Sequence, residues 1–288
     1  MRSRAAVLAA LATPFLLLQG CSGGLLSPVG PVGLAERTIL LNSVAIMLAI
    51  VVPVILATLA FAWWFRASNT RARYLPTWEY SGRIELIVWS IPALVVFFLG
   101  GIAWIGSHDL DPARPLPSSQ KPLEVDVVSL DWKWLFIYPD QGVASINQLI
   151  APVGVPLHLR ITSASVLNVF FVPRLGSEIY AMNGMTSQLN LQADEPGRYH
   201  GLAAHFSGDG FSDMDFELHA VTPAEFTGWA ANARAAGEPT LDAASYRQLL
   251  VQTQNVKPYT YRAVLPGLFD AIVNQKLPPG LGPQVTEK

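Results

Sequence analysis

The sequence predicts a membrane protein of mixed class, with a hairpin of two transmembrane helices, an external all-β sandwich and a small helical C-terminal arm. Of its 288 residues, 51% are hydrophobic and only 14% are charged, which is too apolar for an ordinary soluble domain. Two long uncharged stretches lie in the first third of the chain, and short strand-like runs separated by turn residues follow them. The net charge of −2 offers no basic field for nucleic acid.

The first twenty residues have the pattern of a secretory signal peptide. Two arginines, Arg2 and Arg4, precede an apolar stretch over residues 5–18. A basic segment followed by a short apolar segment is the order found in export signals. We therefore predict that residues 1–20 are a signal peptide.

The single cysteine, Cys21, follows this segment directly. Gly20 precedes it, an order that resembles the lipobox of bacterial lipoproteins, in which the cysteine is acylated and becomes the mature N-terminus. Gln19 departs from the small or branched residue usual at its place, and the alternative is a plain signal anchor with an incidental cysteine. We expect lipid attachment at Cys21 and a lipidated linker over residues 21–37. One cysteine permits no intrachain disulfide and no site that needs two thiolates.

Two uncharged stretches, residues 38–65 and 86–107, predict the transmembrane helices. A membrane helix needs about 20 apolar residues, so both stretches are long enough. Pro53 and Pro92 lie inside them, and proline is tolerated in a membrane helix when neighbouring helices satisfy the freed backbone groups. The alternative is a buried core helix, and the length of the two stretches favours the membrane spans. We place the membrane hairpin at residues 38–107.

The loop between the two predicted spans is basic. Residues 66–83 contain four arginines, namely Arg66, Arg71, Arg73 and Arg83. The segment before the first span has only Arg37, beside Glu36. The positive-inside rule therefore places the loop in the cytoplasm. The expected location is a bacterial inner membrane, with the N-terminus and the C-terminal domain on the periplasmic side.

Strand-like runs fill residues 121–222. The first, residues 123–130, alternates apolar and acidic side chains with a period of two. Further runs occupy residues 134–138, 145–151, 156–163, 168–172, 187–193, 197–204 and 215–221. Seven or eight strands within about 100 residues predict an antiparallel sandwich or a Greek-key barrel.

Helical spacing begins after residue 222. Residues 223–236 and 241–254 have apolar side chains three and four apart, and residues 265–275 form a shorter element. We predict a helical C-terminal arm over residues 223–276. The Pro/Gly-rich tail at 277–288 is expected to be disordered.

Five blocks in this order resemble subunit II of the haem–copper oxidases, most closely the branch of cytochrome o (bo-type) ubiquinol oxidases. The blocks are FAWWFRASN at 61–69, IELIVWSIPAL at 84–94, VVSLDWKWLFIYPDQG at 127–142, SVLNVFFVPRLGSEIYAMNGM at 165–185 and ADEPGRYHGLAAHFSGDGFSDM at 193–214. The resemblance covers residues 30 to about 220, and the helical arm fits the same family. It implies that the sandwich is a cupredoxin-like domain.

The same resemblance implies that a metal centre has been lost. Cytochrome c oxidases of this superfamily hold two coppers with two cysteines, two histidines, a methionine and a backbone carbonyl. The matching positions here are Ala203 and Ser207 for the cysteines, Asn168 and Phe211 for the histidines, Met214 for the methionine and His205 for the carbonyl. Alanine and serine cannot replace bridging thiolates. We expect no metal and no cofactor in this chain, with the haems and copper in the partner subunit I.

The remaining histidines and methionines are the candidates for a different copper site. They are His200, His205, Met182, Met185 and Met214. A blue copper site still requires a cysteine, and no spacing supports an all-His/Met site. We favour core methionines and surface histidines instead, and we assign no role to His108, His158 or His219. Trp132 and Trp134 are interpreted as packing aromatics because an electron relay would have no copper to serve.

Glu85 opens the second predicted span on its cytoplasmic side. A carboxylate at that depth is costly if buried and tends to be functional when it faces protein. In the family that this chain resembles, the matching glutamate is linked to the cytoplasmic mouth of a proton-uptake pathway in subunit I. The resemblance implies that role for Glu85. The alternative is a solvated interfacial carboxylate offset by nearby Arg83.

The resemblance thus predicts a non-redox subunit II of a proton-pumping ubiquinol oxidase of the aerobic respiratory chain, supporting assembly and proton entry. Its expected partners are oxidase subunits I, III and IV, membrane lipid, and ubiquinol through subunit I. One alternative is a membrane-anchored cupredoxin-like lipoprotein that carries or binds copper. Another is a menaquinol oxidase, because the quinone is chosen in subunit I.

Overall fold

The computed structural model describes residues 24–282, which form two compact units that we treat separately. One unit, residues 36–111, holds most of the two long helices, and the other joins the segment before residue 36 to the chain from residue 112 onward. The signal peptide, Cys21 and the last residues of the chain, 283–288, lie outside the described residues.

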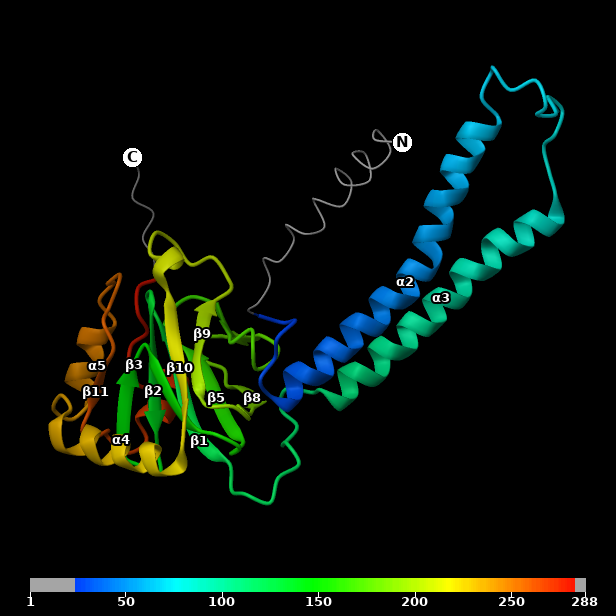
Figure 1. The fold of residues 1–288 in the computed structure, drawn as a ribbon. Coiled ribbons are helices and arrows are strands. Elements are labelled where there is room, and N and C mark those ends of the chain that lie inside the picture. Colours follow the sequence, from blue (N-terminus) through cyan, green and yellow to red (C-terminus); the bar gives the residue numbers. More distant parts are fainter. Residues whose placement is uncertain (1–23, 283–288) are drawn as a thin grey trace, which may run out of the picture. The chain divides into compact units, whose positions relative to one another are not determined.

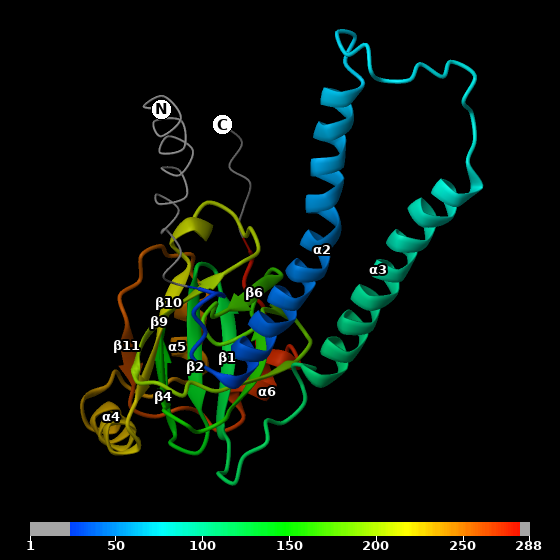
Figure 2. The same cartoon turned by 45° about the vertical axis from the view of Figure 1, so that its right-hand side comes forward.

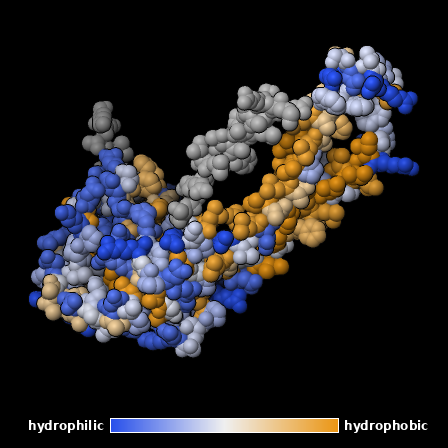
Figure 3. Space-filling view, in the orientation of Figure 1, coloured by the Kyte–Doolittle hydropathy of each residue, from blue (hydrophilic) through white to orange (hydrophobic). Residues whose placement is uncertain are grey.

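Two long apolar helices form the hairpin. Helix α2 (Pro31–Trp64) and helix α3 (Gly82–Asp109) run antiparallel and are joined by a loop (Figures 1 and 2). Each is long enough to cross a bilayer, and each exposes large apolar side chains along its length (Figure 3). The two predicted spans are therefore present. Helix α2 begins seven residues before the uncharged stretch, at Pro31, a residue that suits the first turn of a helix.

The β-domain is a sandwich of two sheets. The larger sheet has the order β11-β3-β2-β1-β5-β8, with β1 (Leu123–Leu130), β2 (Lys133–Tyr138), β3 (Val143–Ile146), β5 (Leu157–Ser163), β8 (Ser187–Leu191) and β11 (Tyr259–Tyr261). The smaller has the order β4-β10-β9-β6-β7, with β4 (Gln148–Pro152), β6 (Asn168–Phe171), β7 (Ile179–Ala181), β9 (Gly197–Ala203) and β10 (Asp215–Val221). Most pairs are antiparallel, but β1 with β5 and β4 with β10 are parallel, which the antiparallel expectation missed.

The run at residues 145–151, expected as a single strand, is two strands in different sheets. Asn147 separates β3 from β4 and adopts a positive φ of 51°. Asparagine tolerates this left-handed conformation better than most residues. Its side chain accepts a hydrogen bond from the Trp134 backbone (2.7 Å) and donates one to the Val256 carbonyl (2.8 Å). The change of sheet at Asn147 is therefore held by hydrogen bonds to both β2 and the C-terminal arm.

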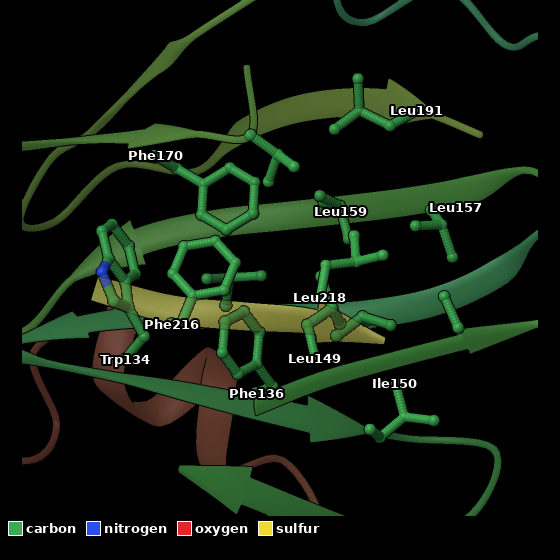
Figure 4. Close-up of a cluster of buried hydrophobic side chains, with 14 of the residues drawn as sticks. Trp134, Phe136, Leu149, Ile150, Leu157, Leu159, Phe170, Leu191, Phe216 and Leu218 are labelled. Atoms are coloured by element: carbon green, nitrogen blue, oxygen red, sulfur yellow. The ribbon is translucent and has the colours of Figure 1, made fainter. Parts of the chain in front are cut away.

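The larger sheet buries apolar side chains on both of its faces. Trp134, Phe136 and Tyr138 of β2 point into the core between the sheets, which Figure 4 shows around Phe170 and Phe216. The residues that alternate with them belong to a second core, which consists of Val128, Leu130, Leu135, Ile137, Ala144 and Ile146 from the sheet together with side chains of the C-terminal arm. The arm is therefore needed to cover this sheet.

The C-terminal arm contains α4 (Pro223–Ala236), α5 (Ala243–Leu249) and α6 (Leu268–Val273), in agreement with the three helical runs of the sequence. Thr222 caps α4 through a capping box with Glu225. The arm also supplies β11, an edge strand that the helical pattern did not reveal. Gly280, in the expected disordered tail, donates its N–H to the Ala164 carbonyl (2.8 Å), so this part of the tail packs on the domain.

The segment that leads into α2, residues 27–30, and the first turn of α2 are packed against the sandwich rather than free as a linker. Val29 donates to the Arg174 carbonyl (2.8 Å) and accepts from the Asp194 N–H (2.8 Å), and Gly33 donates to the Leu175 carbonyl (3.0 Å). A Cβ on Gly30 would lie 1.9 Å from a backbone oxygen, so only glycine fits there. The first turn of α2 is thus tied to the β-domain.

Lys133, at the start of β2, is a buried cation that connects the sandwich to the arm. Its side chain donates to the Val251 carbonyl (2.8 Å) and to Thr253 Oγ1 (2.7 Å). Only 2% of the residue is exposed. Burial lowers the pKa of Lys133 to about 8, although the nearby Asp131 favours the charged form.

This depressed pKa predicts a pH-dependent stability. Between pH 8 and 10.5 the unfolded chain binds more protons at this lysine, so stability rises with pH across that window. Relative to Lys133→Met, the wild type should gain up to about 3 kcal/mol of unfolding free energy over this range. Thermal or denaturant unfolding at several pH values measures the difference. Lys121→Met is the matched control, because Lys121 is exposed and its pKa is raised by Asp140. If the unfolding free energy changed with pH at the same slope in both variants, the pH dependence could not come from Lys133.

Candidate functional site

The loop between β9 and β10 is the place where the family pattern puts copper ligands. It contains a short 3-10 turn, η1 (Phe211–Asp213), and its ends are closed by backbone hydrogen bonds. Ala203 donates to the Met214 carbonyl (3.0 Å), and Ala204 donates to the Val169 carbonyl of β6 (3.1 Å). The structure therefore brings the matched positions of β6, β9 and the loop together.

The side chains at two of these positions form a hydrogen bond with each other. The Asn168 side-chain amide donates to the Met214 sulfur (3.1 Å), and both residues are 1% exposed. The Asn168 Oδ1 accepts from the Val169 N–H (2.9 Å), so both ends of the amide are bonded. The Met214 sulfur is therefore the acceptor of a buried amide. Both side chains are uncharged, and the contact between them is part of the buried packing of the domain.

The two former cysteine positions offer no metal donor of the required kind. Ala203 is buried with only a methyl group. Ser207 is also buried, its hydroxyl oxygen lacks a partner within the described part of the chain, and its carbonyl accepts from the Trp132 indole N–H (3.0 Å). A neutral hydroxyl does not bridge copper as a thiolate does.

Trp132 holds this loop in place, a role that the sequence did not reveal. It adopts a positive φ of 65°, which is rare for a bulky side chain. A Cβ on Gly210 would lie 2.4 Å from the indole, so the loop backbone packs directly on the ring. The indole hydrogen bond to Ser207 adds to this packing. Trp134 lies deeper, edge-on to Phe170 at 5.4 Å, which confirms the interpretation of this residue as a packing aromatic.

The remaining candidate ligands point elsewhere. His205 is exposed and its Nδ1 lies 3.1 Å from the Phe206 carbonyl, while Phe211 packs edge-on against Phe206 at 5.6 Å. Met182 is half-buried, and Met185 and His200 are exposed. Within residues 24–282 no cluster of three or more His, Cys, Asp or Glu side chains could hold a metal ion. The residues present do not fit the two-copper centre of the family pattern.

The other histidines lie in local contacts. His158 Nδ1 is 2.6 Å from Glu124 Oε2, and His219 Nε2 is 2.7 Å from Glu217 Oε2. The neighbouring His219 holds the pKa of Glu217 below its usual range. His108 packs against Trp104 near the end of α3, with ring centroids 4.5 Å apart and the ring planes tilted by 39°.

Glu85 lies in the first turn of α3, directly after the loop of the hairpin. Its backbone N–H donates to the Ser81 carbonyl (3.0 Å), and its side chain is exposed. The positive end of the helix dipole favours a carboxylate at this position. This placement alone is compatible with the solvated carboxylate and with a proton-collecting group, and it keeps Glu85 reachable from the loop side.

Comparison with known proteins agrees with this architecture. A family model described as the periplasmic domain of cytochrome c oxidase subunit II matches residues 141–221, and one described as the COX aromatic-rich motif matches residues 235–280. Cytochrome bo(3) ubiquinol oxidase subunit 2 of Pseudomonas aeruginosa is 47% identical, covering 91% of this chain and 79% of that protein. Ubiquinol oxidase subunit 2 of Acetobacter aceti is 49% identical, covering 90% of this chain and 84% of that protein.

A solved structure, the periplasmic domain of subunit II of cytochrome oxidase of Bradyrhizobium japonicum, covers 41% of this chain and 98% of that chain, with 23% identity and a TM-score of 0.38.

A two-helix membrane hairpin, a cupredoxin-like sandwich and an aromatic-rich arm define the subunit II class of the haem–copper oxidases. Identity near one half over nine-tenths of its length places the chain more narrowly, and it belongs to the family of ubiquinol oxidase subunit 2. The hairpin therefore lies in a bacterial inner membrane, with the sandwich on the periplasmic side.

The Asn168–Met214 contact gives a prediction that separates packing from metal binding. Met214→Leu keeps the side-chain volume but removes the acceptor of a buried amide, which should cost about 1–3 kcal/mol of unfolding free energy. The oxidase turnover of the intact complex should stay unchanged, because we expect no electron to pass through this contact. Urea unfolding and steady-state oxygen consumption measure the two effects. A collapse of turnover with unchanged stability would show that Met214 is a ligand.

Proposed function

We propose that this chain is the non-redox subunit II of a proton-pumping ubiquinol oxidase. The complex oxidises ubiquinol, reduces oxygen to water and moves protons outward as the last step of an aerobic respiratory chain. The relatives that cover most of the chain carry the name of this subunit. The chain acts as a member of a multi-subunit haem–copper oxidase, and its own duties are assembly, stability and proton entry.

The replacement of the copper ligands is the observation that carries this proposal. A water-soluble electron donor outside the membrane needs an entry port in the periplasmic domain. Here the port positions hold an amide bonded to a thioether, a methyl group and an uncharged hydroxyl. A quinol dissolved in the bilayer delivers its electrons within the membrane and needs no such port. The sandwich persists as a fold without its electron-transfer site.

The proposed partners and cofactors follow from electron entry within the membrane. The haems and the catalytic copper lie in subunit I, and subunits III and IV complete the complex. Helices α2 and α3 expose apolar side chains that pack against subunit I and lipid. Close contacts between helices are favoured by Pro53, Pro92 and the small pair Gly100-Gly101. A Cβ at either glycine would meet nothing within 4 Å in this chain alone, so a neighbouring helix can approach there.

Two residues carry further parts of the proposal. Cys21 is acylated after removal of residues 1–20, which the mass of the mature N-terminus would decide. Glu85 collects protons at the cytoplasmic end of α3 and passes them to the uptake pathway of subunit I. The exposure of Glu85 at the first turn of the helix leaves its carboxylate accessible to protons from the loop side.

The electron donor tests the proposed function. The complex, purified through a tag on this chain, should consume oxygen with a short-chain ubiquinol and should not consume it with reduced soluble cytochrome c. Oxygen uptake with each donor measures the preference. Turnover with cytochrome c at a rate similar to that with ubiquinol would contradict the proposal, and so would recovery of the chain without haem. Comparing a menaquinol analogue in the same assay settles the quinone.

Glu85→Gln tests the proton-entry role. The neutral amide cannot exchange a proton, so turnover should fall at least about threefold, an added barrier on the order of 0.7 kcal/mol. Haem content and subunit composition should stay unchanged. The matched control is Glu79→Gln, which removes the same charge from an exposed position on the neighbouring loop. Oxygen consumption across pH 6–8 measures both variants, and equal turnover of the two would leave Glu85 a solvated carboxylate.

A further inference from the structure

The loop that joins the two membrane helices has a charge that the proposed function does not use. We call residues 65–83, which are this loop and the first two residues of α3, the arginine loop. It contains four arginines against a single acid, Glu79. Arg71, Arg73 and Arg83 are exposed, and within residues 24–282 none of them forms an ion pair with a carboxylate. Three guanidinium groups are therefore available to a ligand outside the chain.

The fourth arginine and an asparagine order the start of this loop. Arg66 donates to the Trp63 carbonyl (2.8 Å) and to Ser68 Oγ (3.0 Å), and its guanidinium lies over the Trp63 ring. Asn69 donates to the Trp64 carbonyl (2.5 Å) and accepts from the Arg71 N–H (3.2 Å). These bonds satisfy the last carbonyls of α2. They also hold Arg71 close to the end of the membrane helix.

Aromatic side chains accompany the arginines. Tyr74, Trp78 and Tyr80 are 87%, 59% and 68% exposed. Tyrosine and tryptophan are enriched at the depth of lipid headgroups, where one end of the ring is apolar and the other is wet. Figure 3 shows the hydrophilic loop at the tip of the two apolar helices. The loop thus has the composition of a segment that lies at a membrane surface.

The chemistry selects an anionic ligand with phosphate oxygens. A guanidinium group presents a planar fork that matches phosphate with two hydrogen bonds. The loop lies on the cytoplasmic side, where basic segments next to a membrane helix are attracted to anionic lipids. We propose that the arginine loop binds the headgroups of anionic phospholipids in the cytoplasmic leaflet, through Arg71, Arg73 and Arg83.

The test uses the intact complex and two lipids. The complex is placed in nanodiscs of phosphatidylcholine with spin-labelled phosphatidylglycerol or spin-labelled phosphatidylcholine as the probe. The motionally restricted fraction of each probe gives the relative association constant. Arg71→Gln combined with Arg73→Gln should lower the preference for phosphatidylglycerol by about fivefold for each arginine, or about twenty-five-fold for both. Raising the salt from about 20 mM to about 500 mM should weaken the preference of the wild type.

Two controls keep the outcome clear. Arg71→Lys with Arg73→Lys conserves the charge and should retain most of the preference. Arg234→Gln with Arg262→Gln removes the same charge from the periplasmic arm and should change nothing. An unchanged preference in the Arg71/Arg73 glutamine variant would overturn the proposal. Loss of haem-containing subunits from that variant, with an unchanged lipid preference in the complexes that remain, would also overturn it and would assign the arginines to a partner protein.

Discussion

The larger sheet of the sandwich is apolar on both faces, and the rest of the periplasmic domain depends on this constraint. One face meets the smaller sheet and the other would expose Val128, Leu135 and Ile146 to water without the C-terminal arm. Burying both faces fixes the arm, its edge strand β11 and the buried Lys133 that holds the arm to β2. The domain is therefore stabilised by two hydrophobic cores.

A fold held by two cores does not need a metal ion to close it. In many small metal-binding domains the ligands and the fold form together, because metal binding supplies free energy of folding. Here the loop after β9 is closed by backbone bonds, by the Trp132 indole and by the contact between Asn168 and Met214. The metal-binding loop is thus replaced by ordinary packing while the sandwich is kept. In the proposed function, electrons do not enter through this domain, because a quinol within the bilayer supplies them.

The sequence predicted the elements whose signals are local and missed the contacts that join distant residues. The two spans, β1 and the three helices of the arm follow from hydrophobic period and length. The turn at Asn147 was missed because an apolar run does not show a change of sheet. β11 is too short to stand out from a helical pattern. The single cysteine of the sequence was enough to predict that no site with two thiolates can form. The hydrogen bond from Asn168 to Met214 joins residues 46 positions apart, so no short stretch of sequence predicts it.

The central claim is that the sandwich carries no redox centre, and metal content tests it most directly. The complex is purified from native membranes through a tag on this chain, and its haem and copper are counted. The partner subunits are then stripped away and copper is counted again on the isolated chain. A redox-inert subunit predicts haem in the complex and no copper on the chain alone. A chain that purifies without haem and retains copper would contradict the claim and identify a copper carrier.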